Sequence, residues 1–101
     1  MVRSASPMQA KERLEPGTAH LTDEEICRLG EEIYGRDLKH VLEPTQAGKF
    51  VAIHVANGDY FVAADDVEAL DAAEAKYPGE VFYLGRIGDA DAFRVGAEHR
   101  A

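Results

Sequence analysis

The sequence contains no tryptophan, a single cysteine and no long apolar run. A transmembrane helix needs about 20 consecutive apolar residues, so we expect no membrane-spanning segment and no membrane partner. Arg3 has no apolar stretch behind it, which indicates no secretory signal. The lone Cys27 excludes a disulfide within the chain and fits the reducing conditions of the cytoplasm.

Basic residues are also scarce. The chain has 11 Lys and Arg against 19 Asp and Glu, which gives a formal net charge of −8. Nucleic-acid binding depends mainly on phosphate contacts made by Lys and Arg, so we expect no nucleic-acid partner. Opposite charge speeds protein association, so this acidic chain favours a basic protein as its partner.

Arrangements that usually carry catalysis or metal binding are missing as well. The four histidines are scattered, without the i,i+4 pair of a helical zinc site; they are His20, His40, His54 and His99. Glutamates surround Cys27 and disfavour its thiolate, and paired carboxylates fall at predicted helix starts, where the helix dipole explains them. We therefore predict no catalytic residue, no metal site and no cofactor.

The N-terminal part combines an irregular segment with a strong helix signal. Residues 1–20 are expected to form a flexible tail, because prolines, serines and a glycine interrupt any hydrophobic period. After the tail, apolar residues recur with a helical period, and Thr22 and Glu25 form a capping box at the helix start. Gly35 predicts a bend or break, and Pro44 is expected to end the helix.

The segment from Gly48 to Gly88 is predicted to be the folded centre of the chain, and it opens with a β-hairpin. Two runs rich in β-forming residues, 49–56 and 59–64, flank Asn57-Gly58. Asn-Gly is the strongest short hairpin signal, because a type I′ turn needs positive φ at both central positions.

The register of this hairpin has two candidates. A two-residue loop would place His54 opposite Phe61. A three-residue loop with Gly58 in a bulge would place His54 opposite Tyr60 and turn the second strand over. The sequence favours the first register only mildly, since both strand faces are apolar.

A second helix and a second pair of strands follow the hairpin. Asp65 and Glu68 have the spacing of a capping box, and Pro78-Gly79 stops the helix. Residues 81–87 alternate as a strand, and residues 92–95 form the predicted last strand after a turn.

This order predicts an α+β fold, in which an N-terminal helix precedes a ββαββ unit with a small, mainly antiparallel sheet. Residues 21–95 are expected to form the single domain, and residues 96–101 a frayed C-terminus. We expect the helices to pack on one face of the sheet.

Most aromatic residues lie in the second half of the chain. If one helix covered the sheet, the four short strands could not hide them all, and exposed aromatic surface would mark an interface. If the two helices covered opposite faces, the same residues would form the core. Both interpretations stay open for the seven residues concerned, which are Phe50, Tyr60, Phe61, Tyr77, Phe82, Tyr83 and Phe93.

Several short motifs in this segment resemble a family of short uncharacterised bacterial proteins. They are Gly48-Lys49-Phe50-Val51-Ala52-Ile53, Gly58-Asp59-Tyr60, Tyr77-Pro78, Phe82-Tyr83-Leu84 and Arg86-Ile87-Gly88. This resemblance implies no activity. The hairpin followed by a helix is also similar to antitoxin domains of the HicB type, although the third strand that precedes the helix in those domains is missing here. That likeness implies an antitoxin-like, regulatory role.

These observations favour a non-enzymatic protein-interaction or regulatory module that acts through an aromatic-rich sheet and an acidic surface. It would bind a protein partner or associate with itself. The alternative is a small-ligand-binding or enzymatic domain with its site near His54, Asp59, Tyr60 and Arg86. The residues expected to bind are those four together with Phe61 and Tyr83.

Overall fold

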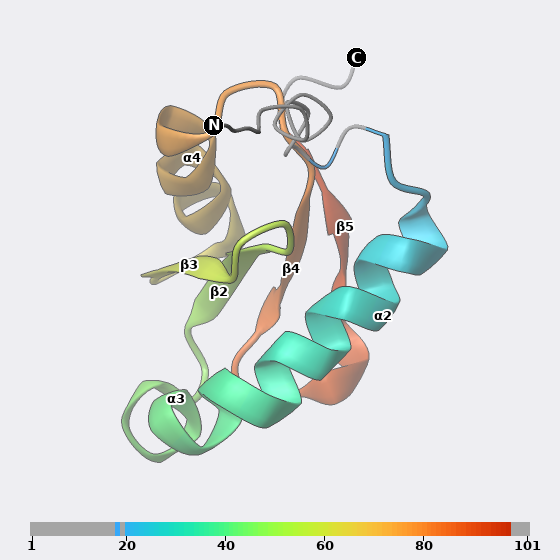
Figure 1. The fold of residues 1–101 in the computed structure, drawn as a ribbon. Helices are drawn as coiled ribbons and strands as arrows, with labels where there is room; N and C mark the ends of the chain where they lie inside the picture. The colour runs from blue at the N-terminus through green and yellow to red at the C-terminus, as the bar shows by residue number, and fades with distance from the viewer. Residues whose placement is uncertain (1–17, 19, 98–101) are drawn as a thin grey trace, which may run out of the picture.

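The computed structural model describes residue 18 and residues 20–97 (Figure 1). Helices and a small antiparallel sheet make up the chain, which confirms the predicted α+β fold. None of the described helices is long and apolar enough to cross a membrane. The elements are α2 (Asp23–Ile33), the π-helical turn η1 (Tyr34–Leu38), α3 (Lys39–Gln46), β2 (Phe50–His54), β3 (Asp59–Ala63), α4 (Asp66–Lys76), β4 (Phe82–Arg86), the 3-10 turn η2 (Ala90–Ala92) and β5 (Arg94–Gly96).

The two ends of the chain are described only in part. Residues 1–17 and 19 of the predicted tail, and residues 98–101 of the predicted C-terminal end, lie outside the described residues. Thr18 is fully buried, and Gly96 is the last residue of β5.

The four strands form one sheet in the order β3-β2-β4-β5, and every neighbouring pair is antiparallel. β3 and β5 are therefore its edges. β5 begins at Arg94 rather than at residue 92, because η2 comes first. The Asp89 side chain caps η2 by accepting a hydrogen bond from the Asp91 N–H at 3.2 Å.

Helices cover both faces of the sheet, so the expectation of helices on one face is wrong. All residues of β2 after Phe50 are buried, and alternate residues point to opposite faces, so each face needs a cover. α4 supplies one cover and α2 with α3 the other (Figure 1). The α2 side is built on Ile26, Ile33, Leu38, Leu42, Val51, Ile53, Val55, Tyr83 and Ile87, and the α4 side on Ala52, Ala69, Ala73, Phe82 and Leu84.

The two covers decide between the two interpretations of the aromatic residues. Phe82 and Tyr83 are buried, and four of the seven are partly buried, while Tyr60 alone among the seven is exposed, with 42% of its surface accessible. The aromatic excess therefore forms core, and it leaves one aromatic side chain for an interface.

The long N-terminal helix starts as predicted. Thr22 accepts from the Glu25 N–H at 3.1 Å, and the Glu25 carboxylate accepts from the Thr22 N–H at 2.9 Å. The predicted break near Gly35 is a π-helical turn, Tyr34–Leu38. In an uninterrupted α-helix, Leu38 would lie roughly 120° around the axis from Ile26. The wider π turn absorbs one residue and returns Leu38 to the buried face.

Pro44 does not end the helix, which continues to Gln46. A proline inside a helix removes one hydrogen bond, here the bond that would join its nitrogen to the His40 carbonyl. His40 is exposed, so water can satisfy that carbonyl. The loss is therefore small, and α3 extends past the predicted end.

The hairpin is present, but both predicted registers are wrong. His54 pairs with Asp59, so the loop has four residues, 55–58. The Gly58 N–H bonds the His54 carbonyl at 2.8 Å, and Gly58 has positive φ. The observed pairing differs by two residues from that of a two-residue loop. An even shift preserves faces, so His54 and Phe61 still share one face.

Gly30 sets how closely α2 approaches the sheet. It is buried, and a Cβ at this position would lie 2.2 Å from Tyr83 Cγ. Only glycine allows this contact between the helix and β4.

Gly30→Ala should therefore destabilise the protein by about 2 kcal/mol, although alanine is the better helix former. Gly35→Ala is the matched control, because a Cβ at Gly35 has no neighbour within 4 Å. Urea denaturation of both variants measures the difference. Equal stability of Gly30→Ala and the wild type would show that the helix can shift without cost.

Candidate functional site

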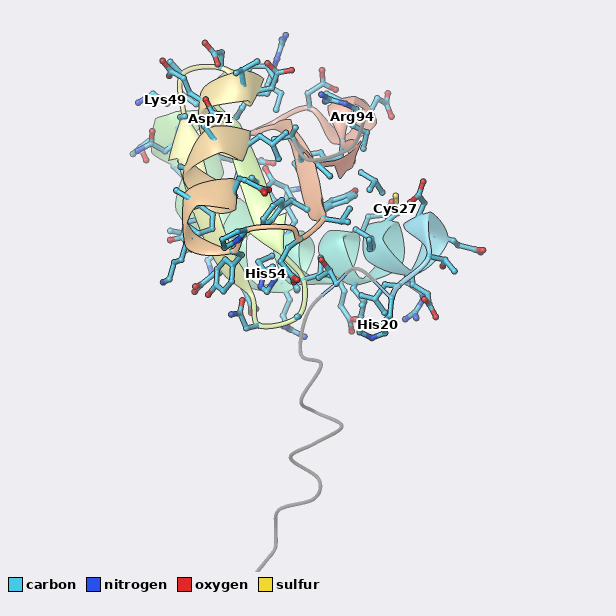
Figure 2. The ribbon with its side chains drawn as sticks, turned by 90° about the horizontal axis from the view of Figure 1, so that it is seen from above. His20, Cys27, Lys49, His54, Asp71 and Arg94 are labelled. Carbon is cyan, nitrogen blue, oxygen red and sulfur yellow. The ribbon has the colours of Figure 1, made fainter. Side chains whose placement is uncertain are left out.

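His54, at the end of β2, is the most completely bonded polar side chain of the sheet. Only 3% of its surface is exposed. Its Nδ1 lies 3.0 Å from Asn57 Oδ1, and its Nε2 lies 2.8 Å from Glu80 Oε1. Figure 2 shows it beside the hairpin loop, between the loop and the start of β4.

Both ring nitrogens of His54 face oxygen atoms of other residues. Asn57 Oδ1 also accepts from the Asp59 N–H at 2.9 Å, and the second oxygen belongs to the Glu80 carboxylate. The ring also stacks on Tyr77 with centroids 4.0 Å apart. Both ring nitrogens therefore have hydrogen-bond partners within the protein.

Asp59 and Tyr77 extend this network along the hairpin. The Tyr77 hydroxyl accepts from Asn57 Nδ2 at 2.8 Å and donates to Asp59 Oδ2. Lys76 Nζ lies 3.2 Å from the same oxygen. The hydrogen bond from Tyr77 and then that from Lys76 hold the pKa of Asp59 below its usual value.

Thr18 closes the network from the N-terminal side. Its N–H donates to Glu80 Oε1 at 2.7 Å, and its hydroxyl bonds both the Val81 carbonyl and the Val81 N–H at 2.8 Å. The Glu80 carboxylate thus joins the N-terminal segment to His54. We call Thr18, His54, Asn57, Asp59, Tyr77 and Glu80 the His54 cluster.

The residues predicted to form a binding site do not come together. His54, Asp59 and Phe61 lie on the α4 face, whereas Tyr60 and Tyr83 lie on the α2 face. Tyr83 is buried there.

Arg86 is separated from the others along the sheet. It pairs with Phe50 at the opposite end of β2 from His54, and its guanidinium lies 5.6 Å from the Phe50 ring. A shared pocket of His54, Asp59, Tyr60 and Arg86 is therefore not formed.

Sequence reasoning missed most members of the His54 cluster. Glu80 follows a helix stop signal and carries no local pattern, and Thr18 lies 62 residues away from it in sequence. Tyr77 was interpreted only as one of the seven core or interface aromatic residues and as part of the Tyr77-Pro78 motif. The one available signal was a buried histidine next to a turn asparagine, which requires further acceptors nearby.

A second feature lies at the π turn. An open hollow there is lined by Gly35, Lys39, His40, Glu43 and Pro44, none of which was predicted as a site residue. The Glu43 carboxylate is held by the Tyr34 hydroxyl at 3.0 Å. Within residues 18 and 20–97, no group of three or more His, Cys, Asp or Glu could hold a metal ion.

A third feature is the outer edge of β3. The Ile87 N–H bonds the Lys49 carbonyl at 2.8 Å, so odd-numbered residues of β2 direct their backbone groups to β4. Even-numbered residues then bond β3, as the bond from Gly58 to His54 shows. Their partners are Asp59, Phe61 and Ala63. The backbone groups of Tyr60 and Val62 therefore point outward.

Comparisons of this chain with protein-family models, with curated proteins and with solved structures find no match.

The Thr18 anchor gives a first prediction for this region. Thr18→Val keeps the shape but leaves the backbone groups of Val81 unpaired, so it should destabilise the protein by about 1–3 kcal/mol. Thr45→Val, at an exposed position of α3, should change stability by less than about 0.5 kcal/mol. Thermal or urea denaturation compares the two. Similar effects for both variants would mean that the anchor contributes no stability.

Tyr83 gives a second prediction, for alkaline pH. Burial, with smaller contributions from Glu31 and Cys27, raises the pKa of Tyr83 from 10.0 to about 12. The folded state therefore holds the phenol proton more tightly than the unfolded state does. The resulting stability is complete below pH 10 and is lost as pH rises toward 12. Tyr83→Phe should lose less stability over this range than the wild type; equal losses in urea denaturation would refute the prediction.

Proposed function

We propose that this protein is a non-enzymatic interaction module that binds another polypeptide by adding a strand to the β3 edge. Main-chain hydrogen bonds supply the affinity in this mode of recognition, and side chains on alternate positions supply the specificity. The observation that carries the proposal is the pair of outward-pointing backbone groups at Tyr60 and Val62.

The composition of β3 supports this use. Natural edge strands avoid pairing by means of lysine, proline, a bulge or very short length. β3 reads Asp-Tyr-Phe-Val-Ala, which has high β propensity, and its one charged residue, Asp59, is bonded to Lys76 and Tyr77. β5, at the other edge, has three residues and an exposed Arg94. β3 is the better platform for an added strand.

The buried His54 also supports a binding role over a catalytic one. Both of its ring nitrogens are bonded within the cluster, and the residues of the alternative ligand site are spread over two faces and two ends of the sheet. The acidic composition favours a basic polypeptide. The antitoxin-like role and the cytoplasmic location stay predictions from the sequence.

Val62→Pro tests the proposal, because it removes one outward N–H without removing a bond of the sheet. A library of displayed random peptides is selected on the wild-type protein, and the selected peptides are then measured on the variant by calorimetry. We expect peptides of extended, basic sequence whose affinity falls at least about tenfold on Val62→Pro, which corresponds to the loss of one to two hydrogen bonds.

Val62→Thr is the matched control, since threonine keeps the N–H and the β-branched shape. It should bind the peptides like the wild type, and all three proteins should give the same far-UV circular dichroism. Peptides that bind Val62→Pro as tightly as the wild type, or a selection that yields no binder, would overturn the proposed function.

A further inference from the structure

The side of α4 that faces the β3 edge has a self-complementary sequence. Glu68, Ala72 and Lys76 are four residues apart and so lie on one flank of the helix, and all three are exposed. Lys76 bonds Asp59 of β3, which places this flank toward the β3 edge. The opposite flank carries Asp66, which pairs with Arg94 of β5 at 3.4 Å.

The middle of this flank lies level with the middle of β3. Lys76 and Asp59 are at the same level because their side chains meet. Four helical residues rise about 6 Å and two strand residues about 6.6 Å. α4 returns along β3 from the contact of Lys76 with Asp59, so these rises bring Ala72 level with Phe61, the central residue of the strand. A single twofold axis perpendicular to the sheet can therefore pass close to Ala72 and to Phe61.

We infer that the polypeptide added to β3 is β3 of a second copy, antiparallel and related by a twofold axis at Phe61. This inference rests on the proposed function, and it names a second copy of this chain, rather than the basic polypeptide that the net charge of −8 alone would favour, as the partner. In this register Tyr60 pairs with Val62 of the other copy and exchanges two backbone hydrogen bonds with it. By symmetry, Val62 pairs in the same way with Tyr60 of the other copy. Every residue from Asp59 to Ala63 then has a partner residue, and the two sheets become one.

The side chains fit this pairing. On the α2 face, the exposed Tyr60 ring lies against Val62 of the other copy, an aromatic and β-branched pair that stabilises neighbouring strands. On the α4 face, Phe61 meets its own copy across the axis. The same surface patch thus serves on both copies, as a twofold interface requires.

The charges of the α4 flank also fit this arrangement. The two α4 helices lie antiparallel along the seam, and the axis brings Glu68 of each copy toward Lys76 of the other. The small Ala72 at the axis leaves room for the helices to approach. These two attractive pairs, and the bonding of Asp59 within each copy, offset repulsion from the net charge of −8.

Sedimentation velocity of the full chain, up to about 1 mM, tests the inference, because that range detects even a weak dimer. We expect a reversible dimer for the wild type and Val62→Thr, and a monomer for Val62→Pro. A wild type that stays monomeric overturns this inference alone, and the peptide selection then still decides the proposed function. A dimer that Val62→Pro leaves intact overturns it too, because the copies then meet elsewhere.

Charge reversal tests the antiparallel arrangement of the two α4 helices. Glu68→Lys should raise the dimer dissociation constant about tenfold over that of Glu32→Lys, which makes the same charge change at an exposed position of α2. Equal dissociation constants for Glu68→Lys and Glu32→Lys would overturn the twofold arrangement.

Discussion

The Glu80 carboxylate joins the N-terminal segment to the hairpin end of the sheet. One of its oxygens accepts from His54 at the end of β2 and from the backbone of Thr18, and the residue after Glu80 leads into β4. A buried histidine needs hydrogen-bond partners at both ring nitrogens, because a buried polar group without a partner is costly. The hairpin loop, Tyr77 and the N-terminal segment all contact the His54–Glu80 pair, through Asn57, the stacked ring and Thr18.

Local signals and long-range contacts explain which features the sequence could predict. The capping box of Thr22 and Glu25 involves neighbours only, and the alternation of β4 reflects two covered faces, so both were predictable. The length of the hairpin loop could not be predicted from local sequence, because the Asn57 side chain bonds His54, and His54 in turn bonds the distant Glu80. The burial of Thr18 depends on Glu80 and Val81, which lie 62 and 63 residues away in sequence. No local sequence pattern predicts it.

The candidate site likewise combines a residue that local sequence indicates with residues that only long-range contacts bring to it. A histidine near the turn was recognisable, but Tyr77, which stacks on its ring, and Glu80, which bonds its Nε2, both come from the segment after α4. These contacts turn a predicted ligand site into a structural support. The support holds the hairpin at its loop end through the bonds of Asn57 to His54 and Asp59. An edge held in this way has less to order on binding, which supports the proposed pairing with another chain.

The π turn at Tyr34–Leu38 can also be described in terms of chain length. It is equivalent to one residue inserted into a helix whose buried face is kept on both sides. Ile26 and Ile33 precede the insertion, and Leu38 and Leu42 follow it, yet all four contribute to one core. A relative of this protein that lacked one residue here could form an ordinary α-helix with the same core contacts. An alignment of such sequences would need a gap inside the helix, although no loop is present there.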